Sequence, residues 1–217
     1  GGKNLPGTVG IGHTRWATHG APSDVNSHPQ VSDGGLFAVV HNGIIENYLY
    51  LKNHLIRRGV EFVSDTDTEV VVKLVDYYYK KYNLGPVDAL AKTMVRVRGS
   101  YALCVMFKDY PGEIWAARKE SPMIIGVADG ETYVASDVPA ILKYTRSVYY
   151  IGNLEMARLT PGEVHFYNLD GEEIEKELTE IKWDAEAAEK GGYEHFMMKE
   201  IHEQPRAALD TLNSVVK

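Results

Sequence analysis

The amino-acid sequence predicts an α+β fold in which helices pack outside paired antiparallel sheets. Two observations support this class. In the first half of the chain, apolar residues recur at helical spacing in three successive segments. In the second half, short apolar segments alternate with tight-turn sequences such as ADGE, TPGE and LDGE, as in antiparallel strands joined by hairpins. Helices and strands grouped in this way favour a layered sandwich.

The strands expected in the first half are short and apolar. Val9–His13 predicts a strand, and a polar loop follows as far as Pro29. Leu36–His41 predicts a buried strand that ends at the following Asn-Gly pair, because Asn-Gly is a frequent turn sequence. A further strand is expected at Glu61–Val63.

Three helices are expected in the same half. The first spans Ile44–Arg58 and is followed by Gly59, which suits a C-terminal cap. Thr66 and Glu69 have the spacing of a capping box, which predicts a second helix over Thr68–Tyr82. A third helix follows the next Gly-Pro pair, where apolar residues again recur every three to four positions.

The second half predicts a series of short strands, namely YALCVMF, IWAAR, MIIGV, TYVAS, VYYI, MARL and VHFY. No change in composition marks a linker before about Trp183. We therefore expect one domain over residues 1–182. Residues 183–217 are charged and helix-prone, are interrupted by Pro205, and are expected to connect to a further domain.

Composition and charge exclude several classes of protein. The 217 residues are enough for a real hydrophobic core. A net charge of −7 and the lack of a basic run argue against a nucleic-acid partner. The longest apolar runs are far shorter than the roughly 20 residues of a membrane-spanning helix. The single cysteine cannot form an internal disulfide, so we expect a reducing, cytoplasmic setting.

The loop from residue 13 to residue 29 is the strongest candidate for function, because its density of polar groups is unsuited to a core. Arg15 is flanked by Trp16, with Thr18 and His19 close behind, and its planar guanidinium is suited to gripping a carboxylate. A solvated surface charge is the alternative for Arg15. Three histidines of this loop fit no common zinc spacing, so no metal is expected.

Three further positions each allow two interpretations. Asn42 and Gly43 form either a plain turn or an oxyanion hole made of a side-chain amide and a backbone N–H. Asp67 either caps a helix or holds a substrate ammonium group, and Thr66 is already available as the cap. Cys104 lies within an apolar strand, where cysteine is usually an unreactive small hydrophobe.

Several segments, in order along the chain, resemble one enzyme family. They are GHTRWATHG, VNSHP, VVHNGIIEN, FVSDTDTEV, RGSYAL, SPMIIG, VASD and YEHFMMKEIHEQP. Together they span essentially the whole chain, and they are similar to the glutaminase domain of the glucosamine-6-phosphate synthases, also called glutamine–fructose-6-phosphate aminotransferases (isomerizing). The broader class II glutamine amidotransferases share looser forms of these segments.

The resemblance implies an N-terminal-nucleophile αββα sandwich, incomplete at its N-terminus, and it assigns a role to each loop residue. Arg15 would bind the α-carboxylate of glutamine, helped by Thr18 and His19. Asp67 would bind the α-ammonium group, and Trp16 would lie on the loop that closes over glutamine. The histidine near the end of that loop, at position 28, would have a minor supporting role.

The reaction that the resemblance implies is acyl transfer, with Asn42 and Gly43 as the oxyanion hole. An N-terminal cysteine thiolate would attack the glutamine amide and release ammonia to an isomerase domain that binds fructose 6-phosphate. No cofactor is implied, and the full-length enzyme would be a homodimer. This sequence does not begin with that cysteine, and Cys104 should not replace it, so we expect the chain alone to lack glutaminase activity.

Two alternatives stay open. One is another class II amidotransferase, such as an enzyme that supplies ammonia to phosphoribosyl pyrophosphate, although the TRWATH and NGIIEN segments argue against it. The other is a catalytically inactive module that keeps the fold and binds glutamine or glutamate.

Overall fold

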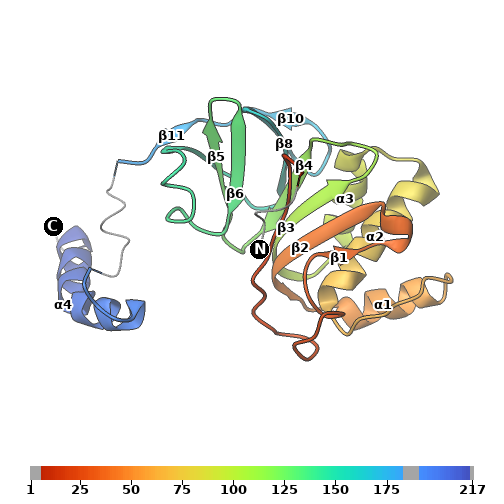
Figure 1. Cartoon of the computed structure of the whole chain (residues 1–217), viewed down its shortest axis with the longest axis horizontal. Coiled ribbons are helices and arrows are strands. Elements are labelled where there is room, and N and C mark those ends of the chain that lie inside the picture. The colour runs from red at the N-terminus through yellow and green to blue at the C-terminus, as the bar shows by residue number, and fades with distance from the viewer. Residues whose placement is uncertain (1–5, 183–190, 216–217) are drawn as a thin grey trace. The chain divides into compact units, whose positions relative to one another are not determined.

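The computed structural model describes residues 6–182 and 191–215, and the chain divides into two compact units, residues 1–180 and residues 181–217. Among the described residues, the first unit contains two antiparallel sheets and helices α1 to α3, and the second contains helix α4 (Figure 1). The predicted α+β class is confirmed. The expected boundary at residue 182 between a domain and a connector stays a prediction.

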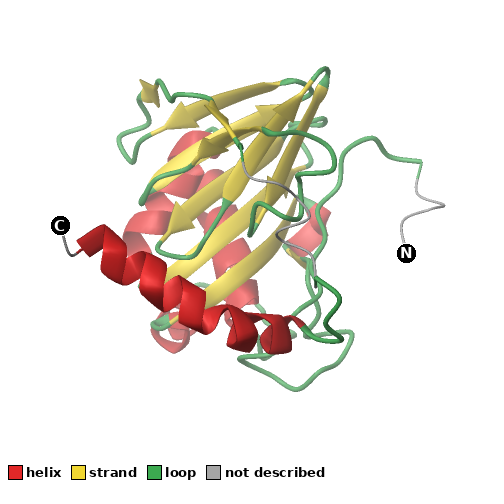
Figure 2. Cartoon of the chain, turned by 90° about the vertical axis from the view of Figure 1, so that its left-hand side faces the viewer, coloured by secondary structure: helices red, strands yellow, loops and turns green. Residues whose placement is uncertain are grey.

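The two sheets lie face to face in the first unit (Figure 2). The larger has the strand order β1-β2-β3-β4-β8-β9-β10, and the smaller has the order β11-β7-β5-β6. The strands of the larger sheet are β1 (Gln30–Val31), β2 (Phe37–Ile45), β3 (Gly99–Phe107), β4 (Ile114–Lys119), β8 (Glu155–Thr160), β9 (Glu163–Tyr167) and β10 (Glu173–Ile174). Those of the smaller sheet are β5 (Ile124–Ala128), β6 (Glu131–Ala135), β7 (Ser147–Tyr150) and β11 (Thr179–Glu180). The strands expected from YALCVMF to VHFY are all present, as β3 to β9.

Helices α1 (Tyr48–Ile56), α2 (Asp67–Tyr82) and α3 (Pro86–Arg96) lie together on one face of the larger sheet (Figure 1). Because successive side chains of a strand point to opposite faces, the strands of this sheet contribute to two cores. Val39 and Leu103 pack on the helix side. Val40 and Cys104 pack on the other side, against the smaller sheet.

Strand β2 is longer than the sequence predicted. It runs straight through Asn42 and Gly43, so the prediction of a turn at this pair was wrong. The ladder with β3 continues as far as Ile45, and α1 therefore begins only at Tyr48. Long-range pairing with β3 outweighs the local turn preference of Asn-Gly in this segment.

Gly43 makes this continuation possible. Its φ is +112°, in the region that favours glycine, and it pairs with Tyr101 across the ladder. A Cβ atom at this position would lie 2.1 Å from the carbonyl oxygen of Ser100 and 2.8 Å from Oγ of Ser121. Only a residue without a side chain therefore fits between β2 and β3 here, directly after Asn42.

Two short strands predicted from the sequence are absent. Val9–His13 and Glu61–Val63 are irregular, because neither segment pairs with a described neighbouring strand. The backbone N–H of Val63 instead donates to Oε1 of Glu69 at 3.0 Å. The short strand β1 and the 3-10 turn η2 (Asp33–Gly35) were not predicted.

The first turn of α2 is fixed by the predicted capping residues. Oγ1 of Thr66 accepts a hydrogen bond from the N–H of Glu69 at 3.2 Å, which confirms its role as the N-cap. The Glu69 carboxylate reaches back beyond the cap and accepts the N–H of Ser64 at 2.7 Å. Glu69 is fully buried, so this network fixes the segment before α2 against the first turn of the helix.

The second unit contains α4 (Phe196–Val215), an amphipathic helix that includes Pro205. The prediction that Pro205 interrupts the helix was wrong, since the helix continues past it; the proline removes one backbone donor without ending the element. Residues 183–190 of the expected connector lie outside the described residues. None of the described helices has both the length and the apolar character needed to cross a membrane.

The close approach of β2 and β3 predicts that Gly43→Ala is strongly destabilising. A clash with Ser100 adds to the backbone strain, so we expect a loss of about 2 kcal/mol or more in the free energy of unfolding. Gly34→Ala is the matched control, because Gly34 also has a positive φ but a Cβ atom added there would meet no other atom within 4 Å, and it should lose about 1 kcal/mol or less. Urea denaturation of both variants measures the difference. Equal losses would contradict the steric argument.

Candidate functional site

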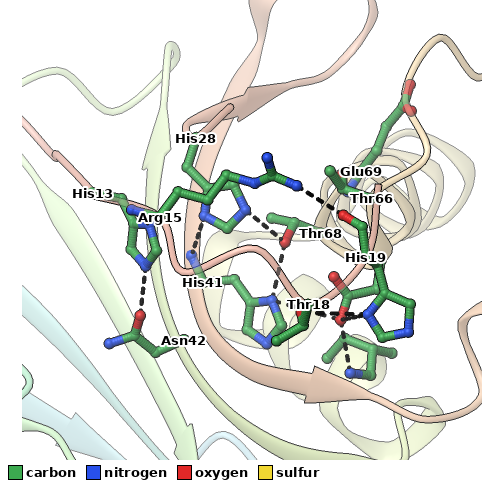
Figure 3. Close-up of polar contacts among 12 residues, drawn as sticks. His13, Arg15, Thr18, His19, His28, His41, Asn42, Thr66, Thr68 and Glu69 are labelled. Carbon is green, nitrogen blue, oxygen red and sulfur yellow. Dashed lines mark hydrogen bonds and ion pairs between the residues drawn. The ribbon is translucent and has the colours of Figure 1, made fainter. Parts of the chain in front are cut away.

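An open cavity of about 320 Å³ lies where the loop before β1, the end of β2 and the start of α2 come together. Its size is at the lower end of the range for small-molecule sites. Every site residue predicted from the sequence lines it: Arg15, Trp16, Thr18, His19, Asn42, Gly43 and Asp67. Other residues of its wall include His13, His28, His41 and Thr68 (Figure 3). Residues from three distant parts of the sequence thus share one wall.

Arg15 is held by its own loop. Its Nη2 donates to the carbonyl oxygens of His19 at 2.8 Å and Gly20 at 3.0 Å, and its Nη1 donates to that of Ala21 at 3.3 Å. A guanidinium has five N–H donors, so two of them remain for a ligand. Arg15 also has a φ of 52°, an unusual backbone conformation for a residue with a side chain.

The residues after Arg15 differ in how closely they approach the cavity. Trp16 is 91% exposed, so its ring contacts solvent rather than the polar groups of the site. Oγ1 of Thr18 lies 3.4 Å from Nδ1 of His19. The His19 ring packs edge-on against Tyr48 of α1 with 4.8 Å between ring centroids, which places it firmly beside the cavity.

Asp67, the first residue of α2, is buried and points its carboxylate at the end of β2. Its Oδ2 accepts the backbone N–H of Ile45 at 2.9 Å. The same oxygen lies 3.9 Å from Nδ1 of His19 and 4.0 Å from Nδ1 of His41. Its other oxygen, Oδ1, accepts no hydrogen bond from any residue that the structure describes, and is therefore available to a cationic ligand.

Asn42 lies on β2, and its carboxamide is held on one side. Oδ1 of Asn42 lies 2.5 Å from Nε2 of His13, while Nδ1 of His13 accepts the backbone N–H of Arg15 at 2.8 Å (Figure 3). The His13 ring in turn lies 4.5 Å from the ring of His28, centroid to centroid. The loop and the strand are therefore joined through one imidazole.

A hydroxyl group links the two more buried histidines. Oγ1 of Thr68 lies 3.1 Å from Nε2 of His28 and 3.0 Å from Nδ1 of His41 (Figure 3). Nδ1 of His28 accepts the backbone N–H of His41 at 3.5 Å, so the proton of a neutral His28 lies on Nε2 and is donated to Thr68. Thr68 then donates to His41, whose Nε2 carries its proton and has no partner among the described residues.

Burial keeps both of these histidines neutral. Desolvation, together with the nearby His13, His41 and Arg15, lowers the pKa of His28 to about 4, although Asp67 acts in the opposite direction. Desolvation also lowers the pKa of His41 to about 4, although Asp67 acts in the opposite direction. Neutral imidazoles serve here as directional hydrogen-bond groups and not as charges.

Comparison with known proteins identifies the family. A model of the glutamine amidotransferase domain matches residues 13–143, which include the loop, β2 and the start of α2. The chain belongs to the glutamine amidotransferase family. Its fold is of the N-terminal-nucleophile hydrolase type, as the sequence predicted.

Curated relatives of this amidotransferase domain include glutamine–fructose-6-phosphate aminotransferases (isomerizing). One from Caldanaerobacter subterraneus subsp. tengcongensis is 61% identical over 96% of the chain and 34% of its own length. One from Clostridium acetobutylicum is 54% identical over 97% of the chain and 34% of its length, and one from Aquifex aeolicus is 48% identical over 97% and 35%. The chain thus spans about a third of the length of these relatives.

Solved structures support the fold of the amidotransferase domain. An allosteric regulatory enzyme of purine biosynthesis aligns with a TM-score of 0.55 and 24% identity over 67% of this chain and 31% of its own. A glutamine phosphoribosylpyrophosphate amidotransferase from B. subtilis, complexed with ADP and GMP, aligns with a TM-score of 0.51 and 24% identity over 79% of this chain and 34% of its own.

Sequence reasoning about the amidotransferase site missed His13, His41 and Thr68 as parts of one hydrogen-bonded wall. His41 and Thr68 stand next to the predicted site residues Asn42 and Asp67, and His13, which the sequence suggested only as a metal ligand, lies two residues before Arg15. A histidine flanked by apolar β-strand residues, as in VVHNG, was a signal for His41, because a buried imidazole needs polar partners. Among the described residues, no group of three His, Cys, Asp or Glu side chains is arranged to hold a metal ion.

Cys104 lies in β3 between the two sheets, where burial raises the pKa of its thiol to about 12. The thiol is therefore protonated near neutral pH, which makes it a poor nucleophile.

The neutral state of His28 makes stability depend on pH. In the unfolded chain His28 binds a proton near pH 6.5, whereas in the folded chain it does so only near pH 4. Because the unfolded chain takes up this proton first, the free energy of unfolding falls as the pH falls from about 6.5 to about 4. We expect His28→Gln, which keeps a donor and an acceptor but does not titrate, to reduce the fall in melting temperature over this range. Parallel curves for parent and variant would contradict the assignment.

The burial of Cys104 predicts slow modification. An electrophilic glutamine analogue should label the folded chain only at the rate at which its core opens, and glutamine should give no protection. The unfolded chain in denaturant is the control and should be labelled rapidly. Mass spectrometry measures the adduct, and rapid labelling of folded Cys104 that glutamine blocks would show that it faces a glutamine site.

Proposed function

We propose that this chain is the glutamine-binding and glutamine-hydrolysing part of an enzyme that transfers ammonia to a sugar phosphate. The observation that supports it most strongly is the composition of the cavity wall. The cavity is lined by a cation, Arg15, an anion with an unpaired oxygen, Asp67, and a carboxamide, Asn42. These groups match the carboxylate, the ammonium group and the developing oxyanion of glutamine, respectively.

Recognition of the amino-acid end of glutamine is proposed for the loop and α2. Arg15 binds the α-carboxylate with the two N–H groups that its own loop leaves free. Oδ1 of Asp67 accepts from the α-ammonium group, while its Oδ2 stays on Ile45. Thr18 and His19 add polar contacts, and Trp16 covers the ligand when the loop closes.

Hydrolysis of the side-chain amide is proposed for the end of β2. A thiolate attacks the amide carbon, and the oxygen that becomes negative is stabilised by the amide nitrogen of Asn42 and the backbone N–H of Gly43. The α-amino group of the attacking residue takes the thiol proton and gives it to the leaving nitrogen, so that ammonia departs as the thioester forms. Water then cleaves the thioester, which releases glutamate and restores the thiol. Cys104 does not supply the thiolate, because its sulfur is buried and protonated. In the class II amidotransferases that the chain resembles, this role belongs to an N-terminal cysteine.

The proposal for the whole enzyme rests on the curated relatives. Their name describes transfer of an amino group from glutamine to fructose 6-phosphate with isomerisation. We propose the same acceptor for the protein that contains this chain, acting as a homodimer in a reducing cytoplasm.

A second candidate is a module that binds glutamine or glutamate without turnover. The state of Cys104 favours it for the 217-residue chain taken alone, since this is the one thiol of the sequence and it is buried. Release of ammonia from glutamine by the chain alone would exclude this second function.

Binding of glutamate and glutamine should depend on Arg15 and Asp67. We expect Arg15→Ala and Asp67→Ala each to weaken binding at least about tenfold, because each removes a charged hydrogen-bond partner of the ligand. Arg57→Ala and Asp129→Ala, which change exposed residues away from the cavity, are the matched controls. Isothermal titration calorimetry measures all five proteins.

Loss of binding in both cavity variants, with unchanged binding in the controls, supports the proposal that Arg15 and Asp67 bind the ligand. Binding that survives in both would place the ligand elsewhere and overturn the assignment. A parent chain that binds neither amino acid would show that these residues are insufficient to form the site.

A further inference from the structure

We propose that His13 is a positioning residue that holds the carboxamide of Asn42 with its nitrogen free to stabilise an oxyanion. The oxyanion role of Asn42 rests on the proposed function. The orientation of the carboxamide does not, because it follows from hydrogen bonds within the chain. His13 thereby joins the loop that grips the amino-acid end of the ligand to the residue that acts on the amide end.

The first step is the tautomer of His13. The backbone N–H of Arg15 points at Nδ1 of His13 with 2.8 Å between the nitrogens, and a backbone N–H is always a donor. Nδ1 is therefore the acceptor, and in a neutral ring the proton lies on Nε2. The left-handed backbone of Arg15, with its φ of 52°, aims this N–H back at a side chain two residues earlier.

The second step is the orientation of Asn42. Nε2–H of His13 donates across 2.5 Å, and the atom that accepts it must be the carboxamide oxygen. Rotating the amide by 180° would place an NH₂ group against another N–H, which is repulsive. The nitrogen of Asn42 therefore points away from His13. Asn42 itself is one of the residues that line the cavity.

The third step is what keeps the ring in place. His13 lies against His28, and Thr68 of α2 holds His28 through its hydroxyl. Thr68 directly follows Asp67, so the His13 ring is supported from the same helical turn that carries the proposed ammonium-binding group. Movement of the Arg15 backbone would remove the acceptor role of Nδ1, release the tautomer and let Asn42 turn. The position of the Arg15 backbone and the orientation of the Asn42 carboxamide are therefore coupled through His13.

Two substitutions separate the two contacts of His13. The amide nitrogen of His13→Gln can occupy the position of Nε2 and still donate to Asn42. The side chain of His13→Asn can accept the N–H of Arg15 but is too short to reach Asn42. Thermal melts should show the same stability for both variants, so that differences between them report on orientation rather than on folding.

The structural arm of the test is nuclear magnetic resonance of the 217-residue chain. Long-range proton–nitrogen correlation should show His13 protonated on Nε2 alone. The side-chain amide resonances of Asn42 should shift in His13→Asn and stay close to the parent in His13→Gln. A proton on Nδ1, or the same Asn42 shift in both variants, would overturn the proposal.

The kinetic arm uses the complete enzyme that contains this chain, with glutamine as substrate. We expect kcat for glutamate release to fall about tenfold or more in His13→Asn while KM for glutamine changes less than about twofold, because only the oxyanion donor is disturbed. His13→Gln should recover most of kcat. Equal loss in both variants, or a change in KM alone, would overturn the positioning role. A parent enzyme that releases no glutamate would overturn the proposed function, and the tautomer measurement would still decide the orientation.

Discussion

The pairing of β2 with β3 is the constraint on which the candidate site depends. It carries the chain through Asn42 and Gly43 in extended form, where local preference favours a turn. The backbone N–H of Ile45, two residues on, then becomes the group that holds Asp67. One ladder therefore places the carboxamide, the glycine and the carboxylate together, although Asp67 is distant in sequence. Loss of register in this ladder would disperse all three.

The histidines of the wall show how burial converts titratable groups into fixed ones. His28 and His41 are too deeply desolvated to hold a proton near neutral pH, and each uses its neutral ring to set the hydroxyl of Thr68. Among the residues that the structure describes, a charged ring in either place would have only Asp67 as a nearby counterion. Because His28 and His41 are neutral, neither offsets the negative charge of Asp67, the carboxylate among the residues that line the cavity.

Much of this arrangement could be predicted from the sequence, and the exceptions have physical causes. Strands β3 to β9 and helix α2 follow from local apolar patterns and from the Thr66 cap, which act over a few residues. The seven site residues could be named because their motifs resemble a known family. The course of β2 could not be predicted, because the space at Gly43 depends on the carbonyl of Ser100 in another strand. Hydrogen-bond directions among His13, His28 and Thr68 likewise depend on contacts between distant segments.

The alternation of β2 between two cores has a consequence for how this domain can vary. His41 falls in the series of side chains that faces the helices, and Asn42 in the series that faces the smaller sheet. His41 is thus buried on the helix side, whereas Asn42 is exposed on the opposite face and is held by His13 of the loop rather than by core packing. Substitutions in the helix-side core can therefore displace His41 directly, whereas the orientation of Asn42 depends on the position of the loop that carries His13. The two faces of one strand thus place neighbouring polar residues under different constraints: core packing for His41 and the position of a loop for Asn42.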